Sequence, residues 1–176
     1  MLLAAIAVVY LLSVGPVSPS SRVLTVCEVL ADDPSKRNGQ VVTVRGLYGG
    51  TDEGVWLSGE CKTHLVTKGL SWGNDLSVYV DLSDERIARS WGRMFDTLRQ
   101  LHADPRHDRI WVTFVGRIET KPSMDDEVVQ MPYGLAKAGF GHMGDSPAEI
   151  NVLGIKDVTV EGRQSGARRS AEKSGK

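Results

Sequence analysis

Basic residues are scarce in the part of this 176-residue chain that is expected to fold. The whole chain carries 21 Lys and Arg against 22 Asp and Glu, a net charge of −1. Five basic residues and one acidic residue lie in 162–176, so residues 22–161 carry 16 basic and 21 acidic residues, a net charge near −5. Phosphate backbones are usually bound by a basic stripe. The composition therefore argues against specific nucleic-acid binding.

Charge is entirely missing from residues 1–21, which begin with twelve unbroken apolar residues. That run is shorter than the ~20 residues that span a bilayer. Followed by small residues, it is typical of a signal peptide, although no Lys or Arg precedes it. We expect a secreted or periplasmic protein; an uncleaved membrane anchor and a buried N-terminal strand or helix are the alternatives. The predicted organisation is a leader (1–21), one folded domain (22–161) and a basic, disordered tail (162–176).

Cysteine is also rare, with Cys27 and Cys61 the two residues of that type in the sequence. In an oxidising compartment an even pair of cysteines indicates a disulfide. We therefore predict a Cys27–Cys61 bridge, against the alternative of two unrelated thiols.

Hydrophobic alternation predicts a mainly β fold with one or two helices. A short helix within Val23–Ala31 would be capped by Thr25 and Glu28. Three strands, an amphipathic helix and two more strands follow, in the order of a five-stranded OB-like barrel. Their ranges are Val41–Tyr48, Val55–Ser58, Leu76–Leu82, Ser83–His102, Ile110–Ile118 and Ile150–Val160. The apolar stripe of the long helix, which includes Phe95, should be the plug that closes one end of the barrel; a ligand-binding wall is the alternative.

Three segments together carry a resemblance. They are the Val26–Leu30 helix with the Asn38–Gly46 strand, the Val112–Gly116 strand, and the run Gly-Phe-Gly-His-Met-Gly-Asp-Ser-Pro-Ala at 139–148. The pattern resembles a group of uncharacterised, exported bacterial domains with an OB-like barrel, over roughly residues 24–160. The resemblance implies a fold and a compartment but no activity.

Catalytic signatures are missing as well. The sequence has no nucleophile elbow, phosphate loop or metal-pair motif, so we expect no enzyme and no cofactor. A zinc site built on Cys61 and His64 would need further ligands and a free thiolate. His142 is the best functional candidate, because the glycines around it permit close backbone approach to a ligand. Its alternative is structural: an imidazole that holds a tight turn.

Three aromatic residues join His142 as ligand-binding candidates: Phe140, Trp72 and Tyr133. Trp72 should be partly exposed beside a Gly-Asn turn, whereas Trp56 and Tyr79 should complete the core. The sequence thus predicts a non-catalytic exported module whose ligand is a peptide, a glycan or a cell-envelope partner. The alternatives are an accessory envelope protein without a small ligand, and a metalloprotein or enzyme that uses His142.

Overall fold

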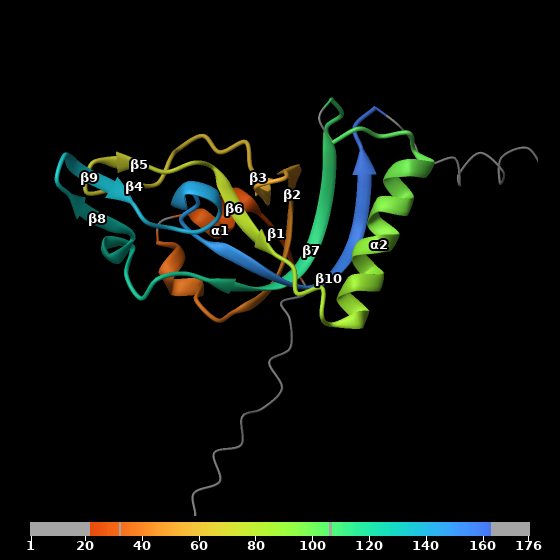
Figure 1. Ribbon diagram of the computed structural model, residues 1–176, viewed down its shortest axis with the longest axis horizontal. Helices are drawn as coiled ribbons and strands as arrows, with labels where there is room; N and C mark the ends of the chain where they lie inside the picture. Colours follow the sequence, from red (N-terminus) through yellow and green to blue (C-terminus); the bar gives the residue numbers. More distant parts are fainter. Residues whose placement is uncertain (1–21, 32, 106, 163–176) are drawn as a thin grey trace, which may run out of the picture.

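The computed structural model describes residues 22–31, 33–105 and 107–162. The described part is mainly β with two α-helices, and its main sheet closes into a ring of strands (Figure 1). Around the ring the strands are β2 (Val41–Thr51), β3 (Gly54–Ser58), β6 (Asp75–Tyr79), β10 (Glu149–Val160) and β7 (Ile110–Glu119), which pairs again with β2. The predicted β-rich class is confirmed, and the leader and most of the tail lie outside the described residues.

Pairing directions in the ring are specific. Neighbouring strands are antiparallel except β6 and β10, which run parallel. The short β1 (Val23–Thr25) pairs in parallel with residues 43–45 of β2. The helix α1 (Val26–Leu30) follows β1 directly. Thr25 and Glu28 form the predicted capping box: the Thr25 side chain accepts from the Glu28 N–H, and the Glu28 carboxylate accepts from the Thr25 N–H.

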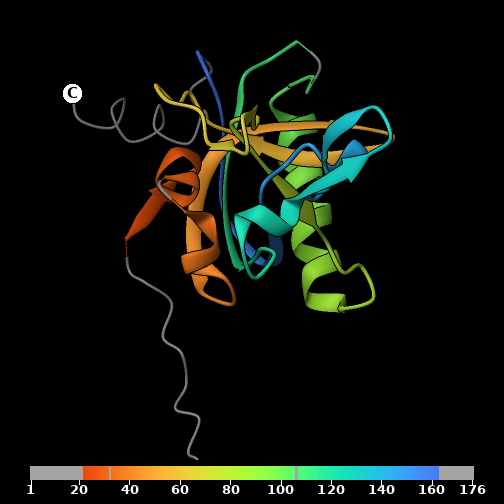
Figure 2. The ribbon, with the colours of Figure 1, turned by 90° about the vertical axis from the view of Figure 1, so that its left-hand side faces the viewer.

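Two small hairpins extend from one end of the ring and face the viewer in Figure 2. One pairs β4 (Val66–Thr67) with β5 (Leu70–Ser71), and the other pairs β8 (Val128–Met131) with β9 (Gly134–Lys137). Three short elements are single helical turns: η1 (Pro34–Arg37), η2 (Met124–Glu127) and η3 (His142–Gly144). The connection between β7 and β10 therefore carries a hairpin of its own, which its weak periodicity did not predict.

Strand alternation builds the core inside the ring. Leu57, Leu76 and Phe114 are completely buried, while their neighbours along each strand point to the other face. Ile110, Ile118 and Ile150 are equally buried.

The long helix α2 (Glu85–Gln100) lies alongside β10 (Figure 1). It starts at Asp84, whose carboxylate accepts the N–H groups of Arg86 and Ile87. Met94 is buried, and the Trp91 ring stacks on Phe114 with 5.9 Å between ring centroids. The expectation that Phe95 is buried as part of this stripe is wrong, because the ring lies at the edge of the stripe and is 36% exposed.

A disulfide joins Cys27 in α1 to Cys61, just after β3, with 5.3 Å between their Cα atoms. This confirms the predicted bridge. The two cysteines are 34 residues apart in the sequence. In the chain-entropy model, a cross-link over a loop of that length stabilises the folded state by roughly 3–4 kcal/mol, because it lowers the entropy of the unfolded chain. No helix in the described ranges is long and apolar enough to cross a membrane.

Candidate ligand-binding pocket

The candidate site is the outer face of β3, β6 and β10. Leu57 and Ile150 are fully buried inside the ring, so the adjacent Trp56 and Glu149 face outward. Cross-strand register places Trp56 opposite Ser77, and Ser77 opposite Glu149. The Ser77 hydroxyl donates to Glu149 Oε2 at 2.9 Å. An aromatic ring, a hydroxyl and a carboxylate therefore form one row across three neighbouring strands.

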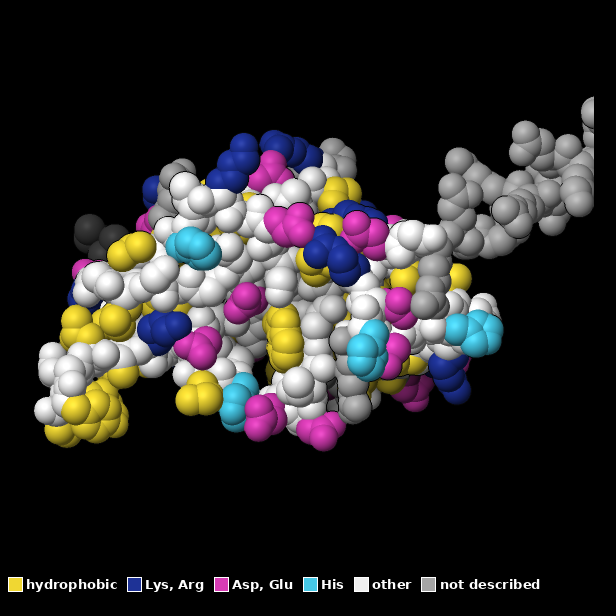
Figure 3. All heavy atoms as spheres, turned by 90° about the horizontal axis from the view of Figure 1, so that it is seen from above, with side chains coloured by type: hydrophobic (Ala, Val, Ile, Leu, Met, Phe, Trp, Pro, Cys, Tyr) yellow, Lys and Arg dark blue, Asp and Glu magenta, His cyan; other side chains and the backbone are white. Residues whose placement is uncertain are grey.

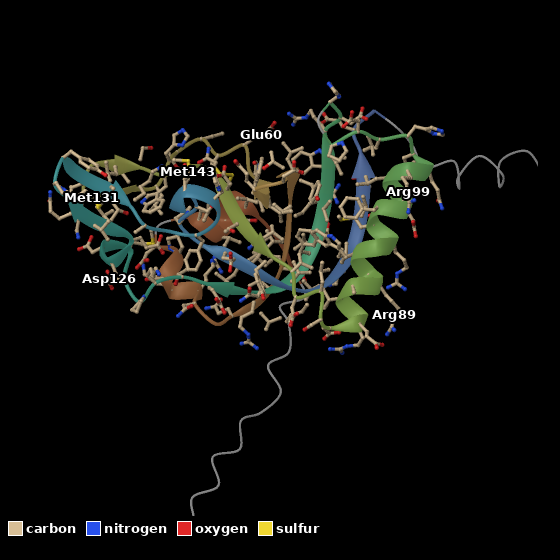
Figure 4. The ribbon with its side chains drawn as sticks, in the orientation of Figure 1. Glu60, Arg89, Arg99, Asp126, Met131 and Met143 are labelled. Atoms are coloured by element: carbon tan, nitrogen blue, oxygen red, sulfur yellow. A yellow bond between two sulfur atoms is a disulfide. The ribbon has the colours of Figure 1, made fainter. Side chains whose placement is uncertain are left out.

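The loop after β9 folds back over this row. Phe140 and Ser146 exchange backbone hydrogen bonds of 2.8 and 3.1 Å, which closes the loop on itself. Between them Gly141 has φ +73° and touches the sheet, because a Cβ at this position would lie 3.2 Å from Ser77 Oγ. Glycine is needed here both for the positive φ and for the close approach. Met143, at the tip of this loop, is labelled beside β6 in Figure 4.

A pocket of about 560 Å³ opens between this loop, the β2–β3 turn and the outer face of the sheet. The β2–β3 turn and the loop meet where His142 Nε2 lies 3.3 Å from Glu53 Oε2. Seen from above, the molecule carries scattered acidic side chains and separate groups of basic ones (Figure 3). The pocket is lined by one tryptophan, two valines, three acidic residues, one histidine and several small or hydroxyl residues. They are Thr51, Glu53, Gly54, Val55, Trp56, Asp75, Ser77, Val78, Gly141, His142, Asp145 and Ser146.

Trp56 forms the aromatic wall of the pocket. Its ring lies across Gly49, its partner on β2, where an added Cβ would be 2.3 Å from the indole Nε1. Because Gly49 has no side chain, the Trp56 ring can lie against the sheet. The ring is half-buried and lines the pocket. Such a ring can stack on an apolar group, a sugar or a cation.

Carboxylates dominate the electrostatics of the pocket. Burial raises the pKa of Asp75, the neighbouring Asp145 raises it further, and Lys137 acts in the opposite direction. Lys137 itself pairs with Asp145, with 2.6 Å between Nζ and Oδ1. Burial also raises the pKa of Glu149, against the hydrogen bond from Ser77 that lowers it. A cation entering the pocket would relieve the cost of keeping these groups ionised.

A buried carboxyl lies under the same loop. Glu127 is completely buried; its Oε1 accepts the Lys121 N–H at 3.2 Å, and its Oε2 has no hydrogen-bond partner among the described residues. Burial raises the pKa of Glu127 to about 7, although Lys121 lowers it. A Cβ on Gly139 would lie 3.0 Å from Oε2, so the carboxyl packs directly against the start of the loop.

The four predicted site residues are not brought together. His142 lines the pocket. Phe140 is half-buried outside it, with Lys121 Nζ 5.5 Å from its ring centroid. Tyr133 is 84% exposed at the far end of the β8–β9 hairpin. The expectation that Trp72 is partly exposed is wrong, because the ring is 1% exposed and its indole N–H donates to Thr67 Oγ1 at 3.1 Å.

Sequence reasoning missed the outward-facing strand residues. Trp56 and Tyr79 were expected in the core, yet Trp56 lines the pocket and Tyr79 is 54% exposed. The signal was present in the alternation, since Leu57 and Leu76 at core positions turn Trp56 and the Asp75–Ser77–Tyr79 series outward. Glu53 and Asp145 line one pocket because the loops close over the sheet, and no local sequence pattern predicts that closure.

Cys61 is bonded to Cys27 and offers no thiolate to a metal. Within the described ranges, no three His, Cys, Asp or Glu side chains gather closely enough to hold a metal ion. Comparisons with protein-family models, curated proteins and solved structures give no match.

Proposed function

We propose that the ring of strands is a five-stranded OB-type barrel and that the protein is an exported, non-catalytic binding module. The observation that carries the proposal is the position of the pocket. OB folds bind ligands on the face of their second and third strands, between the loop that joins strands one and two and the loop that joins strands four and five. Here those parts correspond to β3 and β6, the β2–β3 turn and the β7–β10 connection.

Export is supported by two features. The disulfide suits an oxidising compartment, and the first 21 residues have the composition of a signal peptide. The resemblance to exported bacterial OB-like domains agrees with both. A ligand in that compartment would be a peptide, a glycan or a partner in the cell envelope.

The proposal is tested by a binding screen that reports on the pocket itself. The purified chain would be titrated with short peptides and with oligosaccharides while the assigned indole N–H signals of its tryptophans are followed by NMR. We expect a true ligand to shift the Trp56 signal. Thr51→Trp, which places bulk at the pocket edge, should abolish the shift, while Gln100→Trp at the exposed end of α2 should not. Binding that leaves Trp56 unmoved and survives Thr51→Trp would overturn the proposal.

A second candidate function is supported by the two hairpins. They expose apolar side chains that a single domain has no need to present: Tyr133 is 84% exposed, Val66 59%, Leu135 43% and Val129 38%. Clustered exposed apolar surface marks sites of protein contact. An accessory role in the cell envelope would use this end of the molecule, and Tyr133→Ser with Leu135→Ser should then reduce capture of the partner without moving the Trp56 signal.

A further inference from the structure

We propose that the pocket recognises a lysine or arginine side chain of a polypeptide ligand, an inference that rests on the proposed binding function. Three carboxylates, those of Glu53, Asp75 and Asp145, line the pocket. Two already have neighbouring nitrogen groups: His142 Nε2 lies 3.3 Å from Glu53 Oε2, and Lys137 pairs with Asp145. An anionic ligand would meet this set with repulsion, so the pocket selects for positive charge.

Asp75 is the group that a ligand cation would meet. Its carboxylate is half-buried and forms no hydrogen bond or ion pair with any residue that the structure describes, although the charge of Lys137 lowers its pKa. A carboxylate withdrawn from water is costly unless a donor or a cation compensates for the lost hydration. An ammonium or guanidinium group supplies several donors and a full charge at once.

The apolar wall suits the stem of such a side chain. Register places Trp56 opposite Ser77 and Ser58 opposite Asp75, so Trp56 and Asp75 are diagonal neighbours on the same outer face of β3 and β6. Val55 and Val78 also line the pocket, although their side chains pack toward the core. Lysine and arginine pack their methylene stems on apolar surface while the charged end reaches a polar group, and their cations are attracted to an indole face. A stem along Trp56 would therefore direct the charge toward Asp75.

A second groove indicates that the basic side chain belongs to a polypeptide. This groove, of about 650 Å³, lies between the β2–β3 hairpin and α2, and it shares Thr51 and Val55 with the pocket. Trp91 and Phe95 contribute an aromatic wall with 5.8 Å between their ring centroids. A chain that crosses the turn can place its basic residue in the pocket and a neighbouring apolar residue against Phe95. A small amine would fill the pocket alone.

The test uses the purified full chain and acetylated, amidated pentapeptides. One series has lysine, arginine, glutamine or glutamate flanked by alanine; a second carries leucine at positions near the lysine. We expect lysine and arginine peptides to bind with a shift of the Trp56 signal, and leucine to increase the affinity. Asp75→Asn should weaken binding about three- to fivefold, the upper end of the effect of losing one partly exposed charge pair. Asp126→Asn, on the exposed η2 turn labelled in Figure 4, is the matched control and should change it less than twofold.

Each outcome decides a different point. If glutamine peptides bind as tightly as lysine peptides through the same Trp56 shift, the basic-ligand proposal fails while the binding function stands. If butylamine binds as tightly as the lysine peptides, and Phe95→Ala does not remove the increase in affinity that leucine gives, the proposal that the ligand is a polypeptide fails. If replacing the five basic tail residues with glutamine raises the peptide affinity, the tail of the chain is the occupant and the proposed partner is wrong. If no peptide or glycan moves Trp56, the proposed function itself is refuted.

Discussion

Replacing Glu127 with glutamine should make the stability of the protein less dependent on pH. The carboxyl is fully buried, and one of its oxygens has no hydrogen-bond partner among the described residues. Its folded-state pKa is raised, by burial, from 4.5 to about 7. Glutamine has almost the same shape and never ionises, so the substitution removes the titration while it preserves the packing against Gly139.

The sign of the effect follows from proton binding. Between pH 4.5 and about 7 the folded protein retains the Glu127 proton, while the unfolded chain has already lost it. The stability contributed by the neutral carboxyl is therefore lost as pH rises through this window, and the loss is complete above it. At 1.36 kcal/mol per pKa unit, the wild-type protein should lose about 2–3 kcal/mol of unfolding free energy from this residue between pH 5 and pH 8.

Denaturant unfolding of wild type and Glu127→Gln at pH 5 and pH 8 measures this difference. The variant should gain about 2–3 kcal/mol relative to wild type over that interval, whatever its absolute stability at pH 5. The raised pKa values of Asp75 and Glu149 act in the same direction but are common to both proteins, so they cancel. Glu85→Gln, at an exposed position on α2, should show no such gain. A change between the two pH values smaller than about 0.5 kcal/mol would mean that Glu127 is hydrated or paired, and the reasoning would be refuted.

Three further outcomes are expected. Thiol titration of the denatured, unreduced protein should find essentially no free thiol, and a full complement would contradict the Cys27–Cys61 bridge. Met94→Ala should lower the free energy of unfolding by about 2–5 kcal/mol, measured with denaturant. Phe95→Ala should lower it clearly less, because the ring is 36% exposed. A larger loss for Phe95→Ala than for Met94→Ala would show that Phe95, and not Met94, is the buried residue of the stripe. Titration with single-stranded oligonucleotides near physiological salt should reveal weak, salt-dependent binding that disappears with the basic residues of 163–176, and micromolar binding without them would make the pocket a nucleic-acid site.

The ring of strands was predictable because each strand carries its own alternation. The Val41–Tyr48 and Ile110–Ile118 segments alternate strongly enough to fix which side chains enter the core. The helix between the third and fourth strands was equally clear from its apolar spacing. Apolar spacing did not predict the exposure of Phe95, because spacing identifies the apolar stripe of a helix but not which of its residues lies at the edge.

The rest of the site could not be predicted because it depends on contacts between distant segments. Trp72 is buried by the loop and hairpins around it, and its indole is bonded to Thr67 in β4. Strands of four residues or fewer, such as β8 and β9, have too few positions for a periodic signal. The meeting of Glu53 with His142 requires the loop to close over Ser77, a feature of the tertiary fold alone.

Charge, rather than topology, separates this pocket from the nucleic-acid sites for which OB folds are often used. The proposed barrel and loops offer the same concave face in either case. Phosphate binding would require basic residues on that face, whereas here Glu53, Asp75 and Asp145 line it and Glu149 lies in the adjacent row. Lys137, the basic residue beside the pocket, is already paired with Asp145, and the His142 imidazole lies against Glu53. The acidic lining of this face therefore supports the proposal that its ligand is a positively charged side chain and not a phosphate.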